Sequence, residues 1–405
     1  MAATTGATSA AQSAAMQAQN AIAVNAQIRA AVLQNSIEVK QSIFDQTIQT
    51  PGSTNNVVQI PFRNVGLIKG FLVKVTANLA NTGANQATPT NLNISNLLSN
   101  VTLTDLDNYQ RINTAGWHLG FLGTSKEGFP HGAAMLSTSF DEPVKYGSNF
   151  AVLSASSSLA ATSGTGSAQN YYWVPCSYSA TDLRGAIFSG VVNATGYLQL
   201  TINPTPGVNA STTDPTLAVY QSTGASAVAF SSVTIQVYQV YLDQLPRFTS
   251  GANQGAPILP PLDIATQYRL NNTSLTGVSV GQDFPIPFSN FQQFLSLSLI
   301  YDQAGTVAGG TDLNYFALAA ANTYLPFKID PITQAWFSRH RIKTDFPLGS
   351  YVFDFRNAPI STNQTGNMQI LLNAITAAAG SQVLCGFEAF ALVNNVLGAA
   401  SLPAS

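Results

Sequence analysis

Residues 70–79 read GFLVKVTANL, a stretch in which apolar and polar side chains alternate. One face of this stretch carries Phe71, Val73, Val75, Ala77 and Leu79. A period of two is typical of a β-strand that buries one face and exposes the other. The same alternation recurs in YLQLTIN (197–203) and VTIQVYQVYL (233–242), separated by polar loops. We therefore predict an all-β chain built as an antiparallel sandwich or barrel.

The letters IPFRN at 60–64 precede this strand, and IPFSN at 286–290 precedes a second strand-like stretch, FLSLSLIYD. In that stretch leucines alternate with serines. TDLDNY (104–109) and YGSNFAVL (146–153) follow in the first half, and TDLNYF (311–316) and LGSYVFDF (348–355) follow in the second. This shared order predicts one fold used twice. The segment 247–261 has two glycines, three prolines and no periodicity, so it is predicted to be a linker.

Residues 7–50 contain neither glycine nor proline and are rich in Ala and Gln, which favour helices. The spacing predicts a helix within 13–38 that docks on something apolar through one face. We expect that face to carry Ile22, Ala26, Leu33 and Ile37. Arg29 is the only charged residue before Glu38.

Charged residues make up only 8% of the chain, 16 basic and 18 acidic, against roughly 25% in soluble domains. A neutral surface promotes association, so the composition fits either a neutral, secreted-type β protein or a subunit covered largely by copies of itself. The net charge of −2 argues against direct nucleic-acid binding, which needs a basic surface. No apolar run is long enough to span a membrane and no secretory signal is evident, so we expect synthesis in a reducing cytoplasm. Cys176 and Cys385 are expected to be buried free thiols.

Catalytic and metal-binding patterns are weak. GVSVG at 277–281 matches a nucleophile elbow around Ser279, but Pro285 and Pro287 prevent the helix that this motif requires. None of the histidines, His118, His131 and His340, has a second ligand at zinc spacing. Asp105 and Asp107 lack the rest of a calcium loop. We expect no enzyme activity, no cofactor and no catalytic residue.

Two further features are interpreted as packing or interface elements. RHRIKTDF at 339–346, with Arg339 and Arg341, is the only basic cluster, and an interface strand is favoured over nucleic-acid contact. Tryptophans and one tyrosine are expected to be core or interface anchors: Trp117, Trp173, Trp336 and Tyr241.

Several segments taken together resemble the major capsid proteins of tectiviruses, tailless icosahedral phages with a membrane beneath the shell. These segments are NVGLIKGFLVKVTANL (64–79), GWHLGF (116–121), YYWVPCSYSATDLRGA (171–186), YQVYLDQLP (238–246) and RIKTDFPLG (341–349). The resemblance implies a double jelly roll, two eight-stranded β-sandwiches side by side, with an N-terminal α-helix. It also implies homotrimers that tile the shell, with separate vertex and other capsid proteins as partners.

From the resemblance we expect four regions. Residues 1–45 would form an arm and helix at the capsid base, 46–246 the first roll, 247–261 the linker, and 262–405 the second roll and tail. The helix residues Ile22, Ala26, Arg29 and Leu33 would lie near the internal membrane. One alternative function is considered, that of a jelly-roll module that binds carbohydrate. Ser279 hydrolysis is a third, weaker hypothesis.

Overall fold

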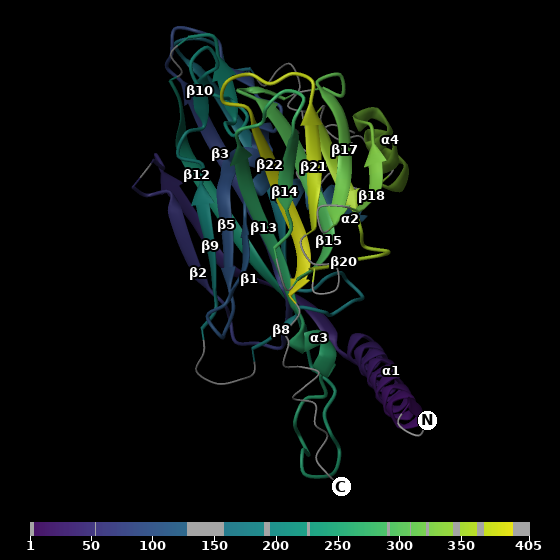
Figure 1. Ribbon diagram of the computed structural model, residues 1–405. Coiled ribbons are helices and arrows are strands. Elements are labelled where there is room, and N and C mark those ends of the chain that lie inside the picture. Colours follow the sequence, from purple (N-terminus) through teal and green to yellow (C-terminus); the bar gives the residue numbers. More distant parts are fainter. Residues whose placement is uncertain are drawn as a thin grey trace.

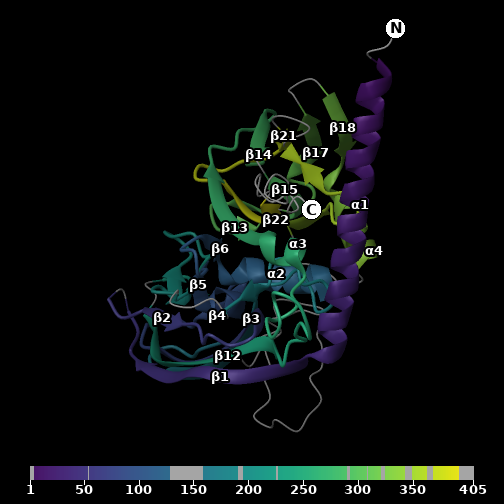
Figure 2. The same cartoon turned by 90° about the horizontal axis from the view of Figure 1, so that it is seen from below.

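The computed structural model describes residues 4–52, 54–127, 158–189, 195–224, 227–289, 292–307, 309–320, 324–342, 349–362 and 368–391. Two β-sandwiches stand side by side with their strands roughly parallel to the long axis (Figure 1). Helix α1, Thr4–Asn35, lies at one end of the molecule and extends along the base of both sandwiches (Figure 2). The predicted N-terminal helix is confirmed, and it begins earlier than expected.

The first roll has two sheets that face one another. One sheet has the order β1-β12-β3-β7, with β8 on β3, and the other has the order β6-β5-β9-β2. Their bounds are β1 Ile37–Gln49, β2 Val57–Pro61, β3 Leu67–Asn81, β5 Leu98–Thr104, β6 Gln110–Thr114, β7 Gly164–Pro175, β8 Ile187–Phe188, β9 Tyr197–Ile202 and β12 Val228–Asp243. A small sheet of β10 Gly207–Asn209, β11 Tyr220–Ser222 and β4 Thr88–Pro89 lies at the end opposite to α1 (Figure 1).

The second roll repeats this plan. One sheet joins β13, β22 and β15, with β16, β19 and β20 on β15, and the facing sheet has the order β14-β21-β17-β18. Their bounds are β13 Gln267–Thr276, β14 Asp283–Pro287, β15 Gln292–Gln303, β16 Thr306–Val307, β17 Leu313–Ala320, β18 Tyr324–Ile329, β19 Ser350–Asp354, β20 Ile360–Ser361, β21 Met368–Ala374 and β22 Gln382–Ala391.

The repeated letters have a structural counterpart at one position. IPFRN ends β2 before β3, and IPFSN ends β14 before β15, and these strands occupy matching places in the two rolls. The predicted match of TDLDNY with TDLNYF was wrong, because TDLDNY follows strand β5 whereas TDLNYF leads into strand β17. The third predicted match was YGSNFAVL with LGSYVFDF, and residues 146–153 of the first of these lie outside the described residues.

The two rolls are joined by backbone pairing as well as by side chains. Strand β6 of the first roll pairs in parallel with β13 of the second, Leu270 opposite Ile112 and Asn271 opposite Asn113. One sheet thus runs through both rolls. Helix α2, Gly116–Glu127, lies between the rolls (Figure 2), and around it Trp117 and Phe121 pack with Ile300, Val352 and Leu384.

Each roll keeps its own apolar core, as the alternation predicted. In β3 the buried positions include Phe71, Val73, Val75, Ala77 and Leu79. The segment predicted to be a linker folds back on itself, since the Phe248 N–H donates to the Ala256 carbonyl. Strand β1 starts at Ile37, within the region expected to be an N-terminal arm.

Candidate assembly surfaces

Helix α1 is held to the molecule by a buried acid. Asp263, in the short helix α3 (Pro261–Ala265), has no exposed surface and accepts hydrogen bonds from Arg29 Nε and Nη2, both at 2.6 Å. Asn25 Nδ2 donates to the same carboxylate at 2.8 Å, and Asn25 Oδ1 accepts from the Leu262 N–H. Charge-assisted bonds of this kind are short and strong, so they fix the helix in both position and rotation.

The docked face of α1 differs from the predicted one. Asn25 and Val32 are buried, and Ile28 and Leu33 pack partly against Leu67, Leu183, Ala186 and Leu242. Ile22 is 62% exposed and Ala26 is also exposed, so neither contacts the apolar cluster. The prediction counted only apolar side chains, whereas Asn25 and Arg29 dock through Asp263. Met16, Ile22 and Val24 remain exposed on this helix.

Helix α4, Pro331–Ile342, has its polar side chains toward the sheet and its aromatic ones toward solvent. Gln334 and Ser338 are buried, and both donate to the Val352 carbonyl. Trp336 is 57% exposed, and it stacks on His340 with ring centroids 4.9 Å apart. Ile332 and Phe337 are 70% and 46% exposed. Surface helices normally show the reverse pattern, so α4 presents an unusual apolar face to solvent.

The basic cluster was predicted to be a strand at an interface; the strand was wrong, and the interface role stays a prediction. Arg339 and Arg341 lie in α4, and Arg339 is exposed. For Arg341 only the helical position is described, and 343–346 lies outside the described residues. The helix forms here because Gln334 and Ser338, one turn apart, share one backbone acceptor of β19.

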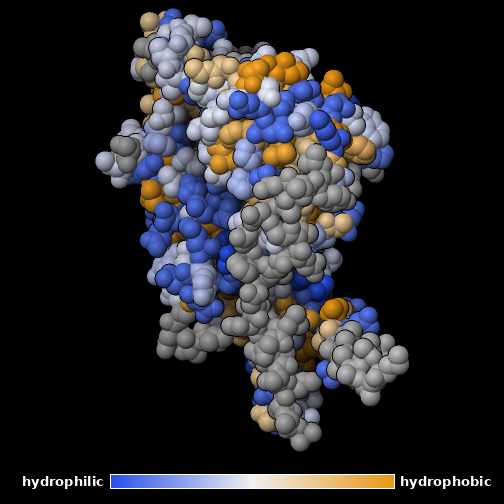
Figure 3. All heavy atoms as spheres, viewed as in Figure 1, coloured by the Kyte–Doolittle hydropathy of each residue, from blue (hydrophilic) through white to orange (hydrophobic). Residues whose placement is uncertain are grey.

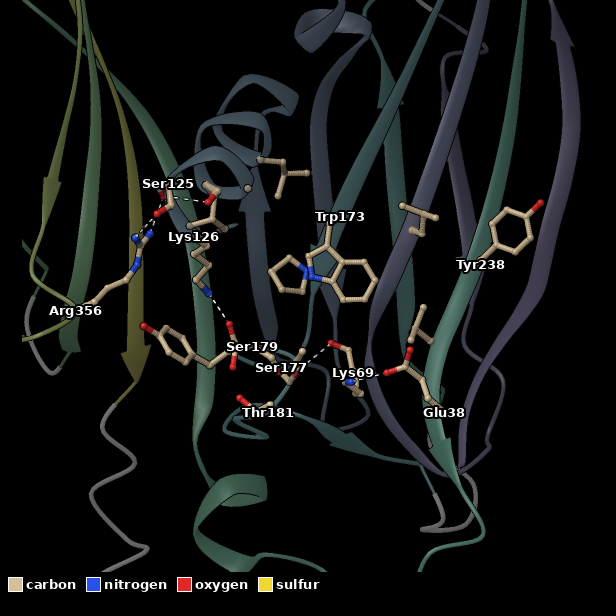
Figure 4. Close-up of a pocket in the computed structure, with 18 of the residues that line it drawn as sticks. Glu38, Lys69, Ser125, Lys126, Trp173, Ser177, Ser179, Thr181, Tyr238 and Arg356 are labelled. Carbon is tan, nitrogen blue, oxygen red and sulfur yellow. Dashed lines mark hydrogen bonds and ion pairs between the residues drawn. The ribbon is translucent and has the colours of Figure 1, made fainter. Parts of the chain in front are cut away.

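A groove of about 1020 Å³ opens between the two rolls beside α2 (Figure 4). Its walls carry apolar side chains from α2 and from the outer face of the first roll: Leu72, Leu119, Leu122, Trp173, Tyr238 and Val240. Asp354, Arg356 and Asn357 line it from the second roll. Trp173 projects into the space in Figure 4.

A buried ion cluster lies beside the groove, and two of its members, Lys126 and Arg356, line the groove. Glu388 on β22 accepts from Lys126 Nζ at 2.8 Å and from Arg356 Nη2 at 2.8 Å. The hydroxyls of Tyr268 and Ser296 donate to the same carboxylate, at 2.6 and 2.7 Å. Burial alone would raise the pKa of Glu388, but the charges of Arg356 and Lys126 outweigh it and hold that pKa well below its usual range.

The same cluster connects the rolls. Lys126 belongs to α2 of the first roll, whereas Arg356 and Glu388 belong to the second. Arg356 also donates to the hydroxyl and carbonyl of Ser125 on α2. Near it His118, wholly buried, has its ring against Gly386, where a Cβ would approach to 2.2 Å. Burial lowers the pKa of His118 to about 4.

The sequence was compared with protein-family models. The N-terminal domain of the P3 major capsid protein matches residues 2–245, and the C-terminal domain of the same protein matches residues 265–404. The chain belongs to the P3 major capsid protein family. It is 38% identical over 394 residues to "Major capsid protein P3" of Enterobacteria phage PRD1, a tectivirus, covering 97% of each chain.

Solved structures show the same fold at low identity. A chain in the atomic structure of Sulfolobus Turreted Icosahedral Virus superposes with a TM-score of 0.61 at 11% identity, covering 90% of this chain and 93% of that one. The PBCV-1 Vp54 structure fitted into a reconstruction of the virophage Sputnik gives 0.52 at 11% identity, covering 88% and 94%. These neighbours are double jelly-roll capsid proteins, and the predicted fold class is confirmed.

Membership of the P3 family makes this chain a structural capsid protein of the virion and not an enzyme. The carbohydrate-binding alternative is set aside on this ground. Ser279 lies in the loop from β13 to β14, with a strand and no helix after it. Among the described residues no group of three acidic, Cys or His side chains could hold a metal, and no helix is long and apolar enough to cross a membrane.

The predicted anchors have different positions in this P3-family chain. Trp117 is buried between the rolls, Trp173 lines the groove, and Tyr241 is buried on β12. Trp336 is exposed on α4. His131 lies outside the described residues. Cys176 and Cys385 are buried free thiols, and burial raises the pKa of Cys176 to about 12. Sequence reasoning missed Asp263 and Glu388, because their partners lie far away in the chain.

Proposed function

We propose that this capsid protein forms homotrimers that tile an icosahedral shell over an internal lipid membrane. The inverted pattern of α4 carries the self-association part of the proposal: three large apolar side chains face outward although polar ones face the sheet. Exposed apolar area of this kind is characteristic of a surface that a partner covers. In a capsid protein the most abundant partner is another copy.

The groove beside α2 supplies a second contact region on the same molecule. It shares Asp354 with the smaller hollow next to α4, where Phe327, Phe337 and Phe353 lie. The apolar groove and helix α4 thus form one continuous region that a neighbouring copy would bury. A ring of copies requires a heterologous contact, in which this region meets a different surface of the neighbour. Within this region Arg339 and Arg341 lie on α4, as proposed interface residues.

The membrane part of the proposal rests on α1. Met16, Ile22 and Val24 are exposed near one end of the molecule, and Figure 3 shows hydrophobic side chains beside this helix. Arg29 is engaged by Asp263, so contact with lipid would be apolar and weak for each copy. Many copies on one shell would add these weak contacts together. Vertex and other capsid proteins are proposed as further partners.

The proposed division of the chain has α1 at the base, a first roll through β12, a connecting segment at 247–261, and a second roll from 262. Strand β1 pairs with β12 over its length, so we propose that the first roll begins at Ile37 rather than at 46.

Light scattering on the purified full chain tests the assembly. We expect a mass three times that of the 42.6 kDa chain that persists on dilution. Trp336→Gln should shift this species toward the single-chain mass, because it removes an apolar anchor from the centre of α4. Tyr109→Gln is the matched control, since Tyr109 is an equally exposed aromatic residue far from α4 in sequence. A wild-type monomer at micromolar concentration would contradict the trimer, and an unchanged Trp336 variant would contradict the role of α4.

A further inference from the structure

Two carboxyl groups meet where the rolls contact one another away from the ion cluster. Asp302 lies near the end of β15 in the second roll and has no exposed surface. Asp214 lies in the first-roll loop between β10 and β11. Gln382 Nε2 donates to Asp214 Oδ2 at 2.8 Å and to Asp302 Oδ2 at 2.9 Å. One amide nitrogen therefore holds both carboxyl groups, each from a different roll.

The surrounding contacts fix this arrangement. Gln382 Oε1 accepts from the Ser274 hydroxyl at 2.6 Å, so its NH₂ group must face the acids. The second oxygens of the acids accept backbone N–H groups, from Thr216 for Asp214 and from Gly305 for Asp302. Gly305 has φ +102°, and a Cβ there would lie 2.5 Å from Pro215. The turn after β15 is thus packed directly on the loop that carries Asp214.

No cation balances the two acids among the ion pairs of the described residues. Tyr301, the neighbour of Asp302 on β15, is also titratable, and the charges of Asp302 and Asp312 both act on it. Two carboxylates in contact cannot both be charged without strong repulsion, so one keeps a proton and donates it to the other.

We propose that Asp214 and Asp302 form a proton-dependent fastening between the two jelly rolls, closed while they share one proton and loosened when both are charged. Burial and the neighbouring Asp214 raise the pKa of Asp302 to about 7. Burial would raise the pKa of Asp214, but the hydrogen bonds from Asp302, Thr216 and Gln382 together outweigh burial and lower that pKa. The proton therefore lies on Asp302, and Asp214 carries the charge.

The sign of the pH effect follows from linkage. If the loop opens, Asp302 reaches water and its pKa returns toward the ordinary value of 3.8. Between that value and about 7 the closed form holds one more proton than the open form, so opening becomes easier as pH rises. Above pH 7 both forms have lost the proton and the effect levels off.

Hydrogen exchange on the full-length protein, followed by mass spectrometry of peptides covering 210–219, tests this fastening. After correction for the intrinsic rate, protection should fall by up to about tenfold per pH unit between pH 5 and 7 and then level off. Asp302→Asn keeps a donor toward Asp214 but cannot titrate, so its protection should stay flat. Asp45→Asn, at an exposed site on β1, is the control and should follow the wild type.

Asp214→Asn is a second variant, and it tests the proton-dependent fastening if Asp302→Asn does not fold. It removes the charged neighbour, so Asp302 should titrate nearer its ordinary range and the fall between pH 5 and 7 should shrink. A wild-type slope retained in either variant would overturn the proposal. So would a wild-type protein whose corrected protection does not change over this pH range.

Discussion

At the residue scale, Glu388 holds two cations that come from different rolls. It has no exposed surface, and both Lys126 and Arg356 are nearly buried with it. Four groups in all donate to one carboxylate, counting Tyr268 and Ser296. A buried ion is tolerated only when partners satisfy it this fully. The junction of the rolls is therefore specified by charge as well as by the apolar packing around Trp117.

Glu388→Gln should destabilise the protein by about 3–5 kcal/mol, because it removes the buried carboxylate that Lys126 and Arg356 share. The free energy of unfolding, measured by urea titration, checks this. Lys40→Gln is the control, because Lys40 is 71% exposed and its pair with Glu38 at 3.8 Å should contribute less than about 1 kcal/mol. Equal effects of the two changes would contradict the role assigned to Glu388.

At the element scale, α1 is held by the buried Asp263 carboxylate in addition to the apolar packing around Val32. Asp263→Ala would remove the carboxylate that Arg29 and Asn25 share and leave Arg29 only the longer contact to Asp182 at 3.7 Å, while the strands of both rolls keep their pairing. We expect hydrogen-exchange protection of residues 16–35 to fall by roughly a hundredfold, since breaking a buried pair costs about 3 kcal/mol or more. Ile22→Gln, on the exposed face, should leave this protection unchanged. A rigid helix in the Asp263 variant would show that apolar contacts alone hold α1.

Elements differ in how far the sequence predicts them. Strands β3 and β12 follow from alternation, because each faces a core on one side and a more polar environment on the other. In β15 serines alternate with leucines, yet Ser296 and Ser298 are buried as well, because the second face of β15 meets the junction around α2. Helix α4 was missed because its apolar face is the outer one. The pattern of apolar residues within one helix does not show whether its apolar face packs on the same chain or faces outward.

At the scale of the whole molecule, the junction responds to acid through His118. This side chain is buried and its pKa of about 4 lies below the ordinary 6.5. The unfolded chain therefore binds a proton that the folded one does not between these values. Stability from this group is present above pH 6.5 and is lost as pH falls toward 4.

We expect unfolding free energy to drop by about 1.4 kcal/mol per pH unit from His118 alone in this range. His118→Gln should remove that part of the slope, whatever its own effect on stability at pH 7. Urea unfolding at half-unit steps from pH 4 to 7 gives both slopes. Identical slopes in the two proteins would show that other groups govern the acid response.

The parallel pairing of β6 with β13 has a mechanical consequence. A force that slides one roll along the other must break backbone hydrogen bonds in shear at Leu270 and Asn271, and it must also pull Lys126 away from Glu388. Two packed but unbonded domains would instead slip at their contact surface. Under load this subunit should therefore deform as one stiff block, and a wall made of such blocks should crack between copies rather than through them.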